Sequence, residues 1–184
     1  MMISKKILRQ QALENLKRVT TSQRVELLTQ LPKMVTQLVQ WKTSQVVAVS
    51  MATTFEIPTS LLIQIAFQQQ KTVVVPKVKT KTVMEFVVVT PETIYEKSTF
   101  GILEPITGQI VPPNIIDLFV VPGLFFSADG HRIGFGGGYY DRYLRQSKGY
   151  RVGMTIANNW QPIPTWNVEE MDQPMDKVIK LTIE

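Results

Sequence analysis

The residues best suited to chemistry lie in one glycine-rich segment, 121–144, which holds more than half of the ten glycines. Gly134, Gly136, Gly137 and Gly138 follow an apolar run and precede a helix predicted to start near Tyr139. Such glycines allow a tight turn whose backbone N–H groups converge with those of the helix start. The pattern is typical of phosphate binding, although neither a P-loop nor a G-x-G-x-x-G motif is present.

Charged side chains beside these glycines complete a candidate site for a phosphorylated ligand. Arg132 and Arg142 carry planar guanidinium groups that suit phosphate oxygens, and Asp141 can hold a divalent cation that bridges them. Each also has a structural interpretation, as an acid in a first helical turn or as half of a surface ion pair. The single histidine, His131, has no partner nearby in the sequence and is predicted to be an exposed loop residue.

A second candidate anion site lies near the start of the chain. Lys5 and Arg9 are four residues apart in a predicted helix, so both lie on one helical face. Like charges at this spacing destabilise a helix by a few tenths of a kcal/mol unless an anion lies between them. The pair therefore indicates either an anion site or an ordinary solvated basic face.

The composition of the 184 residues excludes several functional classes. No cysteine and one histidine leave no disulfide framework, zinc cluster, thiolate nucleophile or iron–sulfur site. A net charge of +5 favours anionic partners without choosing among them. The longest apolar stretch, 118–126, is far shorter than the roughly 20 residues of a membrane span. With no secretory signal visible, the prediction is a cytoplasmic protein.

The elements that must position these residues are helices alternating with short apolar strands. A helix capped by Ser4 and a second from Ser22, restarted at Pro32, form a helical N-terminal region over 4–41. A long surface segment without periodicity is predicted over 91–114. Near-continuous apolar strands alternating with helices favour an α/β fold with a mostly parallel central sheet, covered on both faces. The predicted strands are 46–49, 72–75, 86–89, 118–121, 150–156 and 178–183, with a helix over 58–69.

In their order along the chain, these motifs resemble the 5-formyltetrahydrofolate cyclo-ligase family, also called methenyltetrahydrofolate synthetases. The resemblance covers nearly the whole chain and predicts one cyclo-ligase-like domain over 1–184 with a three-layer α/β/α fold. The motifs that carry it are Pro122-Gly123, Gly130, Arg132, Gly134, Gly136, Gly138, Tyr139-Tyr140-Asp141-Arg142, Phe100-Gly101-Ile102, Glu104-Pro105, the Lys5 to Arg9 pair and the Asp172 to Asp176 segment. The chain departs from the family pattern at Ser127, Phe135, Gly137 and Lys180.

The resemblance implies an ATP- and Mg²⁺-dependent conversion of 5-formyltetrahydrofolate to 5,10-methenyltetrahydrofolate, with release of ADP and phosphate. In the family's mechanism the formyl oxygen attacks the γ-phosphate, and N10 of the substrate then closes the ring and expels phosphate. Both nucleophiles belong to the substrate, so the protein aligns reactants and stabilises phosphoryl charge. The expected partners are these small molecules, with neither nucleic acid nor membrane, and the expected form is a monomer.

Carried over by position, the resemblance assigns four sets of site residues. The catalytic residues are Arg132, Tyr139 and Asp141, and the Mg²⁺ ligands are Asp141 and Asp172. The ATP-binding residues are Lys5, Lys6, Arg9, Arg132, Ile133, Gly134, Phe135, Gly136, Gly137, Gly138, Tyr139 and Tyr140. The folate-binding residues are Met51, Glu56, Phe135, Gly136, Gly137, Gly138 and Tyr139. One carboxylate such as Glu56 can accept both adjacent N–H donors of a pterin edge.

Two functions of other classes remain compatible with the residues. A related α/β fold could act as a sugar-phosphate isomerase or acyl transferase, with Glu104 or Asp141 as an acid/base group. Folate-dependent ATP turnover would separate that alternative from a ligase. A non-enzymatic nucleic-acid binder would suit the basic charge, but the basic residues are dispersed and no nucleic-acid-binding motif is visible.

Overall fold

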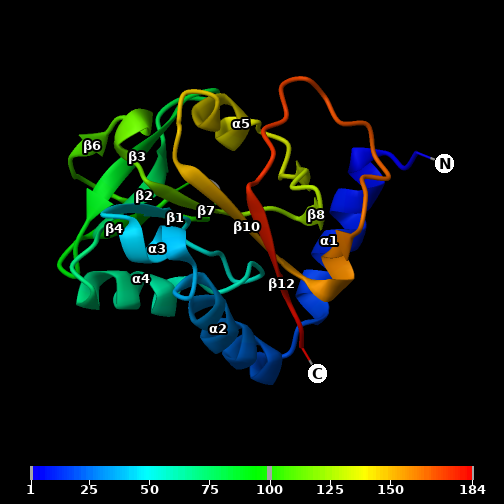
Figure 1. Cartoon of the computed structure of the whole chain (residues 1–184), viewed down its shortest axis with the longest axis horizontal. Coiled ribbons are helices and arrows are strands. Elements are labelled where there is room, and N and C mark those ends of the chain that lie inside the picture. Colours follow the sequence, from blue (N-terminus) through cyan, green and yellow to red (C-terminus); the bar gives the residue numbers. More distant parts are fainter. Residues whose placement is uncertain (1, 99–100, 184) are drawn as a thin grey trace.

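One seven-stranded sheet forms the centre of the computed structural model, which describes residues 2–98 and 101–183. From edge to edge, its strands are β12 (Lys177–Leu181), β10 (Tyr150–Ile156), β7 (Leu118–Val121), β1 (Val46–Val49), β2 (Thr72–Val78), β3 (Met84–Val89) and β6 (Ile110–Val111) (Figure 1). The strands from β12 to β2 are parallel, whereas β3 and β6 are antiparallel to their neighbours. This confirms the predicted mostly parallel sheet.

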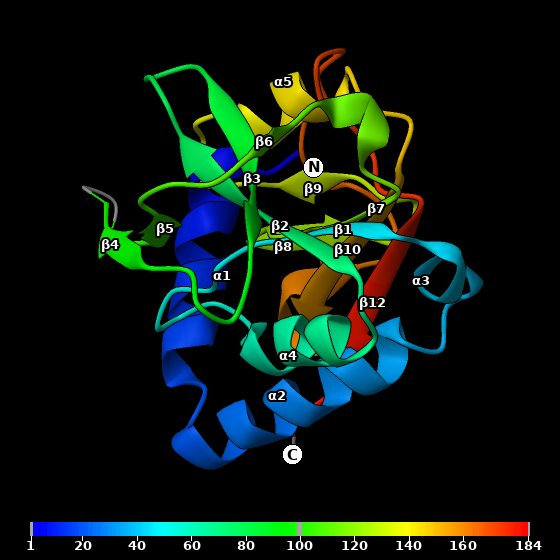
Figure 2. The same cartoon turned by 90° about the vertical axis from the view of Figure 1, so that its left-hand side faces the viewer.

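The central strands are apolar along their length because both of their faces are buried. On β1, Val47 and Val49 belong to one core, and Ala48 between them belongs to the other. Helices α2 (Thr21–Val35) and α4 (Ser60–Gln68) cover the first face, and α5 (Tyr139–Leu144) covers the second (Figure 2). The predicted three layers are therefore present, with the α5 layer the thinner one.

The N-terminal helices agree with the sequence except at one proline. Helix α1 (Lys5–Arg18) begins at its predicted cap, where the Ser4 hydroxyl accepts a hydrogen bond from the Ile7 N–H. The predicted restart at Pro32 is wrong, because α2 continues through that residue, which packs buried in the last turn. A short helix, α3 (Val39–Thr43), follows. Within the described residues, every helix is too short or too polar to cross a bilayer.

Helix α1 lies across the end of the sheet where β7 and β10 finish, rather than over a face (Figure 2). It packs against β8 (Phe125–Ser127) and β9 (Arg132–Ile133), which follow β7, and against η2 (Ala157–Asn159), which follows β10. Strand β8 pairs with β9 and with β11 (Trp160–Gln161) in a small second sheet. The first helix is therefore beside the glycine-rich segment.

The segment 91–114 contains more regular structure than predicted. Strands β4 (Tyr95–Lys97) and β5 (Leu103–Pro105) form a separate hairpin, β6 joins the central sheet, and η1 (Pro113–Ile115) follows it. Strands of two or three residues carry too little periodicity to be recognised from sequence. Of the family motif in this segment, Phe100 lies outside the described residues.

Candidate active site

The carboxyl ends of β1 and β7 mark the point where the order of the sheet reverses. From β1 the chain continues to β2 on one side, whereas β7, β10 and β12 lie on the other. Open α/β sheets bind ligands in the crevice outside such a pair of strand ends. Ser50 and Met51 follow β1 there, and Pro122 and Gly123 follow β7. A small cavity at this place is lined in part by Glu56, Pro122 and Gly123.

The glycine-rich loop 134–138 presents a row of backbone N–H groups. Among the described residues, none of the five N–H groups from Gly134 to Gly138 has a protein acceptor. Two of the loop's carbonyls are held by arginines: Arg9 Nε donates to Gly134 O at 2.9 Å and Arg142 Nη2 to Gly137 O at 2.7 Å. The positive φ angles of Gly136 (105°) and Gly138 (64°) are typical of loops whose N–H groups surround an anion.

Arg132 is buried beside this loop and pairs with Asp141. Its Nη2 donates to Asp141 Oδ1 at 3.0 Å, and the same oxygen accepts from the Gln173 N–H at 3.1 Å. Burial lowers the pKa of Arg132, and Asp141 opposes that effect. Arg132 Nε is also buried but makes no hydrogen bond with any described residue. The guanidinium therefore still has a donor available for a ligand.

Asp172 pairs with Lys5, which joins the chain's first helix to the loop before β12. Lys5 Nζ lies 2.8 Å from Asp172 Oδ2 and 3.1 Å from Glu169 Oε1. Burial acts to raise the pKa of Asp172, but Lys5 and the Glu169 N–H together lower it below its ordinary value. Lys5 and Arg9 thus each have a protein partner, so the interpretation of this pair as an ordinary solvated basic face is wrong.

The carboxylates of Asp141 and Asp172 fit Mg²⁺ bound together with phosphate. Asp141 contacts Arg132 directly, and Asp172 also acts electrostatically on the same guanidinium. Asp141 Oδ2 and Asp172 Oδ1 make no hydrogen bond within the described residues. No cluster of three acidic or histidine ligands exists among those residues. Since Mg²⁺ usually takes one or two carboxylates plus substrate phosphates, this pair suits a nucleotide-bound ion rather than an all-protein site.

Glu56 lies across the crevice in a loop that is held from several directions. Its Oε2 accepts from the Thr53 N–H at 2.8 Å, and its carbonyl accepts from Arg24 Nη1 at 3.2 Å. The other carboxylate oxygen has no hydrogen bond within the described chain. Burial and Glu56 raise the pKa of Tyr140, so its phenol remains protonated at neutral pH. Met51 is half-buried on the same loop.

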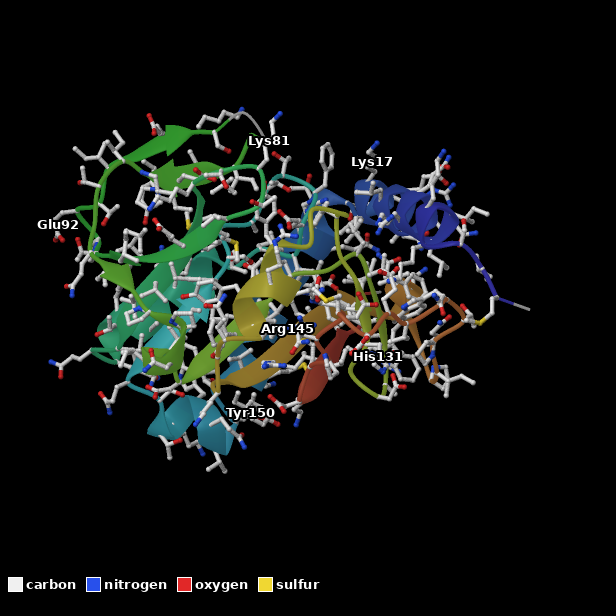
Figure 3. All side chains as sticks on the ribbon, turned by 90° about the horizontal axis from the view of Figure 1, so that it is seen from above. Lys17, Lys81, Glu92, His131, Arg145 and Tyr150 are labelled. Carbon is white, nitrogen blue, oxygen red and sulfur yellow. The ribbon has the colours of Figure 1, made fainter. Side chains whose placement is uncertain are left out.

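Two predicted residues turn out to join α5 to the hairpin between β2 and β3. Tyr139 donates from its hydroxyl to Thr80 O at 3.3 Å, and Arg142 Nε donates to Thr82 O at 2.8 Å. The hairpin tip is marked by Lys81 in Figure 3. Arg142 therefore holds two protein carbonyls, one on the hairpin and one on the glycine loop, instead of standing free for phosphate.

The remaining predicted residues differ in how they relate to the crevice. Phe135 is 56% exposed on the glycine loop, whereas the Ile133 side chain is 1% exposed in the core, so only its backbone can meet a ligand. Lys6 is exposed, and its side chain makes no hydrogen bond or ion pair within the described chain. The prediction for His131 is wrong, because its side chain is only 26% exposed and lies 4.0 Å from Asp129 (Figure 3).

Ser50 is absent from the predicted site although it directly follows β1 at the crevice. Its hydroxyl is buried and makes no hydrogen bond with any described residue. A polar residue placed immediately after a buried central strand is the sequence signal that would have identified it.

The mostly parallel sheet, with a crevice at its switch point, defines an α/β protein of the kind that binds ligands at its strand ends. The model of the 5-formyltetrahydrofolate cyclo-ligase family matches residues 1–180, and the chain belongs to that family. A 5-formyltetrahydrofolate cyclo-ligase of Haemophilus influenzae is 32% identical over 130 residues, which cover 67% of this chain and 69% of that protein. One from Mus musculus is 28% identical over 152 residues, covering 76% and 75%.

Solved structures agree with the family in fold. A 5,10-methenyltetrahydrofolate synthetase of Aquifex aeolicus superposes with a TM-score of 0.84 at 28% identity, covering 96% of this chain and 89% of that one. One from Mycoplasma pneumoniae has a TM-score of 0.78 at 24% identity, covering 96% and 98%. The chain is therefore a ligase of folate metabolism with the fold that the sequence predicted.

Proposed function

We propose that this chain uses ATP and Mg²⁺ to convert 5-formyltetrahydrofolate to 5,10-methenyltetrahydrofolate, releasing ADP and phosphate. The family and the names of its relatives support the folate substrate. The observation that carries the nucleotide part is the row of five unpaired N–H groups at 134–138, beside buried Arg132 and the two carboxylates. Backbone N–H groups, a guanidinium and paired carboxylates are what a metal-bound triphosphate requires.

The reaction needs no nucleophile from the protein. The formyl oxygen attacks the γ-phosphorus, an O–P bond forms, and the bond to the β–γ bridging oxygen breaks to release ADP. N10 then attacks the formyl carbon and forms the new C–N bond. The C–O bond breaks as phosphate leaves with the former formyl oxygen, and the N10 proton passes to solvent. The protein's work is therefore alignment and charge stabilisation.

The phosphate side of this reaction is assigned to the glycine loop, α1 and Arg132. The N–H groups of 134–138 would bind the phosphate oxygens, and Arg132 would stabilise the charge that develops during transfer. Lys5, which contacts Asp172, and Arg9, which contacts Gly134 on the loop, would add two further positive charges beside the phosphates. Bound through Asp141 and Asp172, Mg²⁺ would offset the charge of the phosphates.

The folate side is assigned to the loop after β1. The carboxylate of Glu56 would accept the two N–H donors of the pterin edge, with Met51 against the ring. Tyr139 donates a hydrogen bond to Thr80 O on the hairpin, a contact that would hold its ring beside the folate.

The geometry argues against an isomerase or acyl transferase that uses Glu104 or Asp141 as an acid or base. Glu104 lies on β5, 7% exposed, and accepts a hydrogen bond from the Val78 N–H. Asp141 Oδ1 accepts hydrogen bonds from Arg132 Nη2 and from the Gln173 N–H. Both groups are therefore organised as acceptors rather than as proton carriers.

The test is the near-ultraviolet absorbance of the methenyl product. The protein is mixed with 5-formyltetrahydrofolate, ATP and Mg²⁺, and parallel samples lack ATP or Mg²⁺. Product in the complete mixture alone is expected. Equal product without ATP would refute the nucleotide dependence, and no product from folded protein under any of these conditions would refute the proposed reaction.

A further inference from the structure

Ser50 carries a buried hydroxyl that makes no well-aligned hydrogen bond within the described residues. The residue is 6% exposed at the carboxyl end of β1, and its Oγ makes no hydrogen bond within the described residues. Its backbone is fixed independently, because the Thr59 hydroxyl donates to Ser50 O at 2.7 Å. The side-chain hydroxyl is therefore not needed to hold the turn. An unpaired buried hydroxyl destabilises a fold, so its presence calls for a functional explanation.

A second unpaired hydroxyl, that of Tyr140, faces the first. Tyr140 OH is buried and likewise makes no well-aligned hydrogen bond with any described residue. The Ser50 hydroxyl lies within hydrogen-bonding reach of the phenol oxygen, although the two groups are not well aligned for a hydrogen bond. Strand β1 and helix α5 therefore bring two buried O–H groups together at one place.

This donor pair lies between the two halves of the proposed site. Glu56 and Arg132 both act electrostatically on the Tyr140 phenol, so both charges lie near it, and the Arg132 guanidinium lies 5.9 Å from its ring centre. Glu56 is the proposed acceptor for the pterin, and Arg132 the proposed partner of the phosphate. An oxygen that belongs to the folate and reacts with the phosphate has to lie between them.

We propose that the hydroxyls of Ser50 and Tyr140 bind the formyl oxygen of 5-formyltetrahydrofolate. This inference rests on the proposed function and adds Ser50 to the residues that touch the reacting atoms. An amide-like oxygen has two lone pairs, so it can accept from the protein through one and attack phosphorus through the other. Donors at this oxygen also orient it before transfer and stabilise it when it leaves with the phosphate.

The decisive experiment compares two ligands on two proteins by calorimetry without ATP. 5-Formyltetrahydrofolate carries the oxygen, and 5-methyltetrahydrofolate keeps the same ring and tail but lacks it. Ser50→Ala is expected to weaken binding of the formyl compound about 10-fold, as for loss of one well-placed hydrogen bond. Binding of the methyl compound should change less than about 2-fold, because it has no acceptor there. Tyr140→Phe should give the same selective loss.

Thermal unfolding of the ligand-free protein separates this role from a structural one. Ser50→Ala removes an unpaired group, so its Tm is expected to stay unchanged or rise. Thr59→Val is the matched control, because it removes a hydroxyl that is hydrogen-bonded and should lower Tm by about 3 °C or more.

Four results would overturn the inference. Equal weakening of both ligands would assign the hydroxyls to the pterin ring. Unchanged binding of both ligands by Ser50→Ala, or a Tm loss as large as that of Thr59→Val, would make Ser50 a structural residue. Wild-type protein that binds neither ligand would refute the proposed substrate itself, which distinguishes that failure from a failure of the Ser50 assignment.

Discussion

Asp141→Ala is expected to destabilise the fold as well as abolish turnover, because Asp141 is the counterion of a buried arginine. The Arg132 side chain is 4% exposed, and its Nη2 lies 3.0 Å from Asp141 Oδ1. Removing one partner of a buried pair costs about 3–5 kcal/mol. The lower end, about 3 kcal/mol, applies here because Asp141 is 18% exposed and Asp172 also acts on the guanidinium.

The assay is thermal unfolding of the ligand-free variants at pH 7. For a chain of this size, about 3 kcal/mol corresponds to a Tm lower by roughly 6–12 °C. Asp141→Asn is the matched variant: it keeps an acceptor for the Gln173 N–H and for Arg132, so it should lose about half as much. Its turnover should still fall, because a neutral amide neither binds Mg²⁺ well nor balances the arginine.

A double variant tests the reasoning directly. Replacing Arg132 by Met in the Asp141→Ala background removes the uncompensated charge, so the double variant should be more stable than Asp141→Ala alone. A Tm for Asp141→Ala within about 2 °C of wild type, or no recovery in the double variant, would refute the counterion role.

Three further predictions concern other contacts. The pKa of Asp172 is below its ordinary 3.8, so its contribution to stability is present above that pH and is lost as the pH falls below it. Urea unfolding of Asp172→Asn should therefore lose less stability than wild type on acidification below about pH 4, and parallel curves would contradict this. Arg142→Ala should increase deuterium uptake at 79–83, since it releases the Thr82 carbonyl, and unchanged uptake would argue against that contact. Gly138→Ala forces a side chain to φ 64° with its Cβ 2.7 Å from Arg142, so unfolding should show a loss of about 1–2 kcal/mol, and wild-type stability would be inconsistent with this strain.

The sheet was largely predictable from the sequence because its central strands are buried on both faces. The segments 46–49 and 118–121 are continuous apolar runs in the sequence because both faces of each strand are buried. The strand predicted at 72–75 ends too early, since β2 continues through Pro76 to Val78. The pairing of β2 with β1 ends at Val74. Pro76 lies beyond it, so the lack of a backbone N–H at Pro76 costs no hydrogen bond to β1.

The glycine loop was predictable for a different reason: its residues are adjacent in the chain. The contacts that organise it come from residues far away. Arg9 and Gly134 are 125 positions apart, and Arg142 reaches Thr82 across 60. Nothing in the local sequence tells a free arginine from one that already holds carbonyls. The position of Ser50 after β1 could be read from the sequence, but whether its hydroxyl has a partner depends on what the fold brings to it.

The pairing of Lys5 with Asp172 also sets when the enzyme can become active during its synthesis. The two residues are 167 positions apart, so at about 5–20 residues per second one is made roughly 10–30 s before the other. Until the loop before β12 has been synthesised, Lys5 on α1 lacks its partner Asp172. The proposed phosphate-binding side then also lacks one of its two carboxylates. A nascent chain can therefore form the β1–β2 half of the sheet early, yet the proposed nucleotide site stays incomplete until nearly all of the polypeptide has been translated.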